Sequence, residues 1–124
     1  MASILAVDDS PSMRQLVSMT LKHAGHDVHL AEDGDDALAQ AGSLDVDLVI
    51  TDVHMPNMDG ISLTQSLRAL DKFRFTPILI LTTESAADMK MRGKEAGATG
   101  WIVKPFNAEA LLKVVDRVLE PVRS

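Results

Sequence analysis

The chain of 124 residues has no cysteine, no excess of positive charge and no long hydrophobic run. Without cysteine there can be no disulfide and no thiolate-bound metal, so the sequence gives no redox signal. The formal net charge of -6 argues against nucleic acid and anionic lipid as partners, because both polyanions attract basic surfaces. Cations, including metal ions, suit such a chain better.

The N-terminal apolar stretch is short because Asp8 and Asp9 interrupt it. It cannot form the core of a signal peptide or a membrane span, so we expect a cytoplasmic protein. The chain length suits one domain that buries about two thirds of its unfolded surface. With 46% apolar and 24% charged residues, the composition is that of an ordinary globular protein. We predict a single domain over residues 1–124.

Short apolar runs alternate with segments of helical spacing, which predicts repeated βαβ units. The runs are residues 4–7, 48–50, 78–81 and 101–103. The first three are apolar at consecutive positions, as expected of strands buried on both faces of a parallel sheet. Residues 27–31 alternate polar and apolar side chains, so they are predicted to be the second strand, at an edge. The predicted fold class is α/β.

Five helices are predicted from capping residues and apolar faces. Ser10 and Pro11 begin the first helix, Gly25 ends it, and Asp33 caps the second. The predicted inward positions of the first helix are Met13, Leu16, Val17, Thr20, Leu21 and Ala24. Those of the second and third helices are Ala37, Leu38 and Ala41, and Gly60, Leu63, Leu67 and Leu70.

The last two helices differ in strength. Asn107 is predicted to cap the fifth, which Pro121 ends. The fourth, over residues 86–96, is the weakest, because one of its inward positions is glycine and the others bury little area. We therefore predict that it is poised to move. The inward positions of these helices are Ala86, Met89, Gly93 and Ala96, and Leu111, Leu112, Val115, Val118 and Leu119.

Polar side chains follow every predicted strand except the one at the edge. They are Asp8 and Asp9, Asp52, Thr82 and Thr83, and Lys104. Parallel strands end at the same rim of a sheet, where open α/β sheets bind ligands, so these groups should converge. Three carboxylates within a few ångström repel one another unless a cation neutralises them. Oxygen ligands without cysteine select a hard cation, and Mg²⁺ is the leading candidate.

This arrangement suits phosphoryl transfer to a carboxylate. A carboxylate can attack phosphorus and form an aspartyl phosphate when cations screen the approach of two anions. A metal on one side and Lys104 on the other would provide that screening. The Thr82 hydroxyl could then donate to the phosphoryl oxygens. The pattern indicates a phosphate-dependent switch.

Four motifs, in this order and spacing, resemble the receiver domain of two-component response regulators, most closely the single-domain chemotaxis (CheY-like) type. They are the Asp8 and Asp9 pair, Asp52 with residues 54–60, Thr82, and residues 104–106. The resemblance covers nearly the whole chain. It implies a doubly wound, flavodoxin-like sheet of five parallel strands in the order 2-1-3-4-5, an order known from CheY itself. It also implies a receiver without an output domain, whose signal passes by protein binding.

The resemblance assigns Asp52 as the phosphoacceptor. It assigns Asp8, Asp9, Asp52 and the backbone carbonyl of His54 to Mg²⁺. The protein is then no enzyme in the usual sense, but a phosphoacceptor that assists its own phosphotransfer and autodephosphorylation.

The same resemblance assigns Lys104 to contact with the phosphoryl group and implies a cis peptide bond between Lys104 and Pro105. Thr82 is drawn toward the phosphoryl group. Trp101 stands where the family has a tyrosine or phenylalanine that swings inward as the threonine moves, and an indole is bulkier and has no phenolic hydroxyl. The fourth helix, the strand of Trp101 and the last helix would form the responsive surface. An ordinary strand end and edge packing are the alternatives for Thr82 and Trp101.

Three further residues are predicted to set the lifetime of the phosphate. Thr83 is larger than the alanine or glycine common in the family and would narrow access to Asp52. His54 and Glu84 lie two residues beyond Asp52 and Thr82, at positions that flank the phosphoryl group in the family.

The partners implied by the resemblance are a sensor histidine kinase of the chemotaxis type and a flagellar motor switch component or other protein target. A phosphatase is a further partner, and we expect a monomer that binds neither nucleic acid nor membrane. A phosphate sink, a phosphorelay intermediate and a receiver-like module that never takes phosphate are the alternatives. A phosphatase of the haloacid dehalogenase type would need a second aspartate where this chain has His54. In a flavodoxin-like electron carrier, acids at 8 and 9 would repel the cofactor phosphate.

Two other groups of charged or titratable residues are predicted to be solvated. Gly25 interrupts the first helix, so no regular face holds the three histidines His23, His26 and His29. Basic residues of the fourth helix form an exposed face, or one that meets an acidic partner: Lys90, Arg92 and Lys94.

Overall fold

The computed structural model describes residues 2–53, 55, 58–82, 87–103 and 107–123, with the backbone alone for residues 87–90 and 120–123. Strands and helices alternate along the chain. They are β1 Ser3–Val7, α1 Pro11–His23, β2 Asp27–Ala31, α2 Gly34–Ala41, β3 Leu48–Asp52, α3 Gly60–Arg68, β4 Ile78–Thr82, α4 Ala87–Ala96, β5 Gly100–Val103 and α5 Ala108–Arg123. A short 3₁₀ turn, Asp71–Phe73, follows α3.

The five strands form one parallel sheet in the order β2-β1-β3-β4-β5, which confirms the expected order. β2 lies at an edge, as its alternating pattern predicted. β1, β3 and β4 are interior, and every residue of β3 and β4 is buried. Continuous apolar runs thus mark the interior strands, because helices cover their side chains on both faces.

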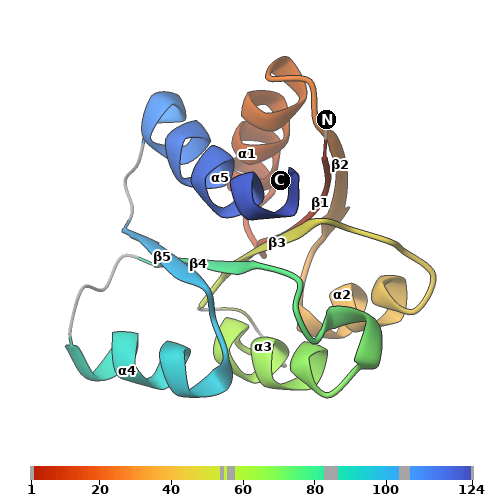
Figure 1. Cartoon of the computed structure of the whole chain (residues 1–124), viewed down its shortest axis with the longest axis vertical. Coiled ribbons are helices and arrows are strands. Elements are labelled where there is room, and N and C mark those ends of the chain that lie inside the picture. Colours follow the sequence, from red (N-terminus) through yellow and green to blue (C-terminus); the bar gives the residue numbers. More distant parts are fainter. Residues whose placement is uncertain (1, 54, 56–57, 83–86, 104–106, 124) are drawn as a thin grey trace.

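Helices cover both faces of the sheet: α1 and α5 lie on one face, and α2, α3 and α4 on the other (Figure 1). On the first face, Leu21 of α1 and Val115 of α5 are buried with Ile50 of β3. On the second face, Leu67 of α3 is buried with Val49 of β3. Ile50 and Val49 are consecutive, and consecutive side chains of a strand point to opposite faces. The result is a three-layer α/β/α domain.

Capping side chains begin four of the helices. Ser10, Asp33 and Asn107 cap α1, α2 and α5 as predicted; the side-chain oxygen accepts a backbone N–H three residues on, at 3.3, 2.8 and 2.7 Å. Asp59, which was not predicted as a cap, begins α3 in the same way at 2.7 Å. Gly25 follows α1 with a φ of 96°, in the left-handed region that favours glycine after a helix.

The buried face of α1 differs from the prediction. Val17, Ser18 and Leu21 are its buried residues, whereas Leu16 is 48% exposed and Ala24 is also exposed. The apolar positions of α1 span a wider arc than the part of the helix that meets the sheet and α5, so those on the flank remain in solvent. The predicted inward positions of α2 and α5 are buried in full or in part.

Two predicted helix ends were wrong. α3 ends at Arg68, and Leu70, predicted inside it, is 38% exposed because Phe73 of the following 3₁₀ turn takes the buried position instead. Pro121 does not end α5, which runs to Arg123. Its missing N–H removes one hydrogen bond from the last turn without breaking the helix. Within the described residues, no helix is long and apolar enough to cross a membrane.

The predicted fourth helix is present as α4. Gly93 and Ala96 are buried at two of its predicted inward positions. The other two cannot be compared, because Ala86 and the side chain of Met89 lie outside the described part of the chain. The motion of α4 stays a prediction. The basic residues found exposed on it are Arg92 and Lys94.

His26 is not solvated as predicted, but 7% exposed. Its Nδ1 accepts the N–H of Ala2 at 3.2 Å. The left-handed turn at Gly25 directs the chain back toward the sheet, so His26 is enclosed just before β2 begins.

Candidate functional site

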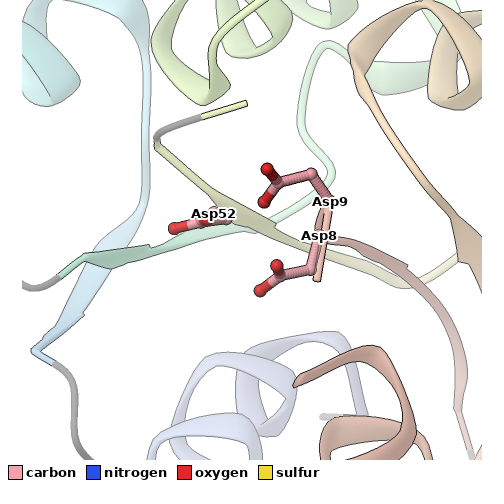
Figure 2. A group of neighbouring side chains, drawn as sticks. All are labelled: Asp8, Asp9 and Asp52. Atoms are coloured by element: carbon pink, nitrogen blue, oxygen red, sulfur yellow. The ribbon is translucent and has the colours of Figure 1, made fainter. Parts of the chain in front are cut away.

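Three carboxylates converge at the carboxyl ends of β1 and β3 (Figure 2). Asp52 is the last residue of β3, and Asp8 and Asp9 directly follow β1. One oxygen of each lies within 4.8 Å of the others. Asp8 and Asp52 are 3% and 7% exposed, whereas Asp9 is open to solvent. The convergence of acids that the strand ends predicted is therefore present.

The register of the sheet explains why two of the acids meet. Val7 of β1 pairs with Thr51 of β3, so the next residue of each strand, Asp8 and Asp52, comes alongside. The Asp8 N–H donates to the carbonyl of Ala31 at 3.1 Å, which extends the hydrogen bonding to β2 one residue beyond β1. Side chains alternate along extended chain, so Asp8 and Asp52 share one face of the sheet.

The chain around Asp8 is held by two donors from the start of α1. The Ser10 N–H donates to Asp8 Oδ1 at 2.9 Å. Arg14 Nη1 donates to the Asp8 carbonyl at 2.6 Å. Arg14 was not identified from the sequence. Its signal is a basic residue near a helix N-terminus, where the helix dipole disfavours positive charge.

Asp52 is held by its own chain. Its Oδ1 accepts the N–H of Val53 at 2.9 Å, and its carbonyl accepts the hydroxyl of the buried Thr51 at 3.0 Å. The Val53 N–H thus orients the carboxylate before any ligand arrives, and the Thr51 hydroxyl holds the backbone that carries it.

Gly60, the first residue of α3, presses directly against the backbone of Asp52. A Cβ at Gly60 would overlap the carbonyl oxygen of Asp52 and come within 2.9 Å of its carbonyl carbon. The Gly60 N–H also donates to the carbonyl of Val53 at 2.9 Å. The sequence reasoning placed Gly60 only on the buried face of a helix, so this role next to the acids was missed.

The charge of the cluster fits a hard cation. Three carboxylates at this spacing repel, and two of them are largely removed from water, which raises the cost of their charges. All the clustered donors are carboxylate oxygens, which Mg²⁺ and similar ions prefer. The exposure of Asp9 leaves one side of the cluster open to solvent. The residues present therefore fit a divalent cation.

The predicted switch pair lies on neighbouring strands beside the acids. Thr82 is fully buried and follows Leu81, the residue of β4 that pairs with Asp52. Trp101 of β5 pairs with Ile80, two residues before Thr82. The indole is partly buried, and among the described residues its Nε1–H has no hydrogen-bond acceptor.

Four predicted site residues lie outside the described residues: His54, Thr83, Glu84 and Lys104. The peptide bond between Lys104 and Pro105 lies there as well. Their predicted roles stay predictions.

Comparison with known proteins agrees with this fold. Residues 4–116 match the family described as "Response regulator receiver domain". The chain is 37% identical over 118 residues to the chemotaxis protein CheY-3 of Vibrio cholerae, with 94% of this chain and 91% of that one covered. It is 35% identical to the chemotaxis protein CheY of Pseudomonas aeruginosa, with 96% and 97% covered.

Solved structures give the same result. The chemotaxis response regulator CheY4 of Vibrio cholerae superimposes with a TM-score of 0.94 at 53% identity, with 96% of this chain and 99% of that one covered. The receiver domain of a sensor histidine kinase from Pseudomonas aeruginosa, which has a magnesium ion coordinated in its active-site cleft, gives 0.89 at 28% identity, with 96% and 98% covered.

The doubly wound sheet, with acids at the ends of its first and third strands, is the architecture that the resemblance to receiver domains implied. The chain belongs to the response regulator receiver domain family, and within it to the CheY type of two-component signalling proteins.

Proposed function

We propose that this chain is a phosphorylation-dependent response regulator that accepts a phosphoryl group on Asp52. The observation that carries the proposal is the cluster of Asp8, Asp9 and Asp52, with ligand oxygens within 4.8 Å of one another. A related receiver has a magnesium ion coordinated in its active-site cleft, which supports the same use of the cluster here.

Asp8, Asp9, Asp52 and the backbone carbonyl of His54 are the proposed ligands of Mg²⁺. A bound Mg²⁺ would neutralise the acids and the incoming phosphoryl oxygens. Asp52 is the proposed nucleophile: a carboxylate oxygen forms a bond to phosphorus while the bond from phosphorus to the imidazole nitrogen of a kinase phosphohistidine breaks. The electron pair of that bond stays with the imidazole. Asp52 is held ready by the Val53 N–H.

The other predicted residues act around the new aspartyl phosphate. Lys104 is proposed to contact the phosphoryl oxygens, and the Thr82 hydroxyl to donate to them. His54, Thr83 and Glu84 are proposed to set how fast water hydrolyses the acyl phosphate. The added charge, about -1.5 to -2, would bias Thr82 and Trp101 toward a second arrangement.

The proposed partners are a chemotaxis-type histidine kinase as donor and a flagellar motor switch protein as target. The support is that the named relatives are chemotaxis proteins. Residues 4–116 are proposed to act as one receiver domain. A pull-down that compares protein with and without beryllofluoride should capture the target only with it. Equal capture under both conditions would contradict switching.

Phosphorylation is tested by incubating the protein with acetyl phosphate and Mg²⁺ and measuring its intact mass. We expect the mass of one phosphoryl group, placed on Asp52, and none in Asp52→Asn or without Mg²⁺. Asp116→Asn, which changes an exposed aspartate of α5, is the matched control and should be phosphorylated normally. An unchanged mass of the parent protein would overturn the proposal.

A further inference from the structure

Gly93 and Trp101 form a contact whose closeness depends on the absence of a side chain on α4. A Cβ built on Gly93 would overlap Cζ3 of Trp101 and come within 3.2 Å of its Cε3. It would also approach Cδ1 of Ile80 at 3.3 Å. The benzene ring of the indole therefore occupies the space that any other residue at position 93 would fill.

No polar contact among the described residues holds the indole there. Trp101 Nε1 is buried without a hydrogen-bond acceptor in that part of the chain, which is unfavourable for a buried donor. The ring instead packs against the apolar cluster of Ile80 and Ala96, joined by Val53 and Ile61. The position of the indole is therefore set by steric packing, and the missing side chain of Gly93 leaves the space that the ring fills.

Glycine is also an expensive residue for the middle of a helix. It is the weakest helix former after proline, and α4 carries it at an internal, buried position. Most glycine positions that need no special conformation are stabilised by alanine. The presence of glycine at this buried position of α4 is therefore explained by the aromatic ring that packs against it.

We propose that Gly93 is a positioning residue for the switch tryptophan: because it has no side chain, the indole of Trp101 can lie directly against the backbone of α4, and the helix holds the ring in that place. This inference rests on the proposed role of Trp101 as the switch residue. A shift of α4 toward β5 would press its backbone against the indole, and an outward rotation of the indole would leave a void beside Gly93.

The surroundings offer space for a displaced ring. Trp101 lines a surface hollow of about 240 Å³ together with Lys94, Ala98, Thr99 and Gly100, at the turn from α4 into β5. An indole expelled from its place against Gly93 can move toward this hollow, where its N–H would meet water.

The test is Gly93→Ala, read by the fluorescence of Trp101, which is the only tryptophan of the chain. Without phosphate or Mg²⁺, we expect a red-shifted emission maximum, a larger acrylamide quenching constant and a lower urea midpoint than in the parent. Gly42→Ala is the matched control, because a Cβ at Gly42 meets nothing within 4 Å and the φ there is -61°. It should leave the fluorescence unchanged and keep or raise the midpoint.

A second comparison keeps the proposal testable if Gly93→Ala folds poorly. In a Trp101→Ala background the overlap is gone, so Gly93→Ala should now raise the urea midpoint measured by circular dichroism. Unchanged quenching in Gly93→Ala would overturn the inference, even with a lower midpoint, because the helix and not the ring would then have yielded. So would a Gly93→Ala effect of the same sign in both backgrounds.

Failure of the proposed function can be distinguished from failure of this inference. If beryllofluoride with Mg²⁺ leaves the fluorescence of the parent unchanged while Gly93→Ala alters it as expected, Gly93 positions the indole but Trp101 is no phosphate-dependent switch.

Discussion

At the scale of single residues, the backbone of Asp52 can take its position only because Gly60, which lies against it, has no side chain. The overlap that a Cβ would make is with backbone atoms of Asp52, which cannot rotate away as a flexible side chain can. The same backbone carries the carboxylate of Asp52, the proposed phosphoacceptor. A side chain at position 60 must therefore displace either Asp52 or α3.

We therefore predict that Gly60→Ala destabilises the fold by about 1–3 kcal/mol, the usual range for overpacking. It should also slow phosphorylation of Asp52 by acetyl phosphate. Urea denaturation and intact mass measure the two effects. Gly42→Ala, with open space at its Cβ, is the control and should change stability by no more than about 1 kcal/mol, in the stabilising direction. Normal stability and phosphorylation of Gly60→Ala would show that the backbone of Asp52 tolerates displacement.

The acids of the site could be predicted from the sequence, while the residues that hold them could not. Asp8 and Asp52 directly continue apolar strands, and that local pattern fixes where they lie. Arg14 and Gly60 act through contacts with the backbone of Asp8 and Asp52. Contacts of this kind follow no periodic pattern along the sequence, so sequence patterns do not reveal them.

At the scale of elements, Arg68 joins the end of α3 to the segment before β4 and to the turn after α4. Its guanidinium donates to the carbonyls of Phe73 and Thr76 at 2.6 Å each, and to that of Gly97 at 3.0 and 2.9 Å. Gly97, which follows α4, has a φ of 103° and packs its backbone against this side chain. Partial burial lowers the pKa of Arg68 by desolvation, yet a guanidinium stays charged at any physiological pH.

We predict that Arg68→Met lowers stability by about 2 kcal/mol, because the carbonyls of Phe73, Thr76 and Gly97 lose a charged donor. Arg68→Lys should recover only part of this, since one ammonium cannot reproduce the fork of a guanidinium. Denaturation midpoints give the values. Arg74→Lys is the control: Arg74 is largely exposed and pairs with Asp71 of the same turn at 3.0 Å, so we expect a change within about 0.5 kcal/mol. Equal stability of the Arg68 and Arg74 variants would contradict this role.

Element types were predictable, and helix faces and ends less so. The alternation of 27–31 predicted the edge position of β2, and the continuous apolar runs of β1, β3 and β4 reflect coverage of the interior strands by helices on both faces. The exposure of Leu16 and Leu70 depends instead on the tertiary arrangement: Leu16 lies on a flank of α1 that no neighbour covers fully, and Phe73 takes the buried position that Leu70 was predicted to fill. Propensity and pattern carry no information about such competition.

At the scale of the whole molecule, the acid cluster links stability to cation binding. Its charges repel in the folded chain, where their ligand atoms lie within 4.8 Å, and are far apart in the unfolded chain. A cation that binds only the folded state stabilises it by about 2.7 kcal/mol at 100 times its dissociation constant. The unfolding midpoint should therefore rise with Mg²⁺ concentration in the parent protein.

We predict that Mg²⁺ reverses the order of stability between Asp9→Asn and the parent protein. Asp9 is exposed and belongs to the cluster, so its neutralisation relieves repulsion without opening the core. Without Mg²⁺ we expect this variant to melt above the parent, and with saturating Mg²⁺ below it, because one ligand and one charge are lost. Asp116→Asn removes an exposed charge far along the chain on α5 and should follow the parent at every Mg²⁺ concentration. Parallel melting curves for Asp9→Asn and the parent would mean that Asp9 takes no part in cation binding, since loss of a true ligand must change the slope with Mg²⁺.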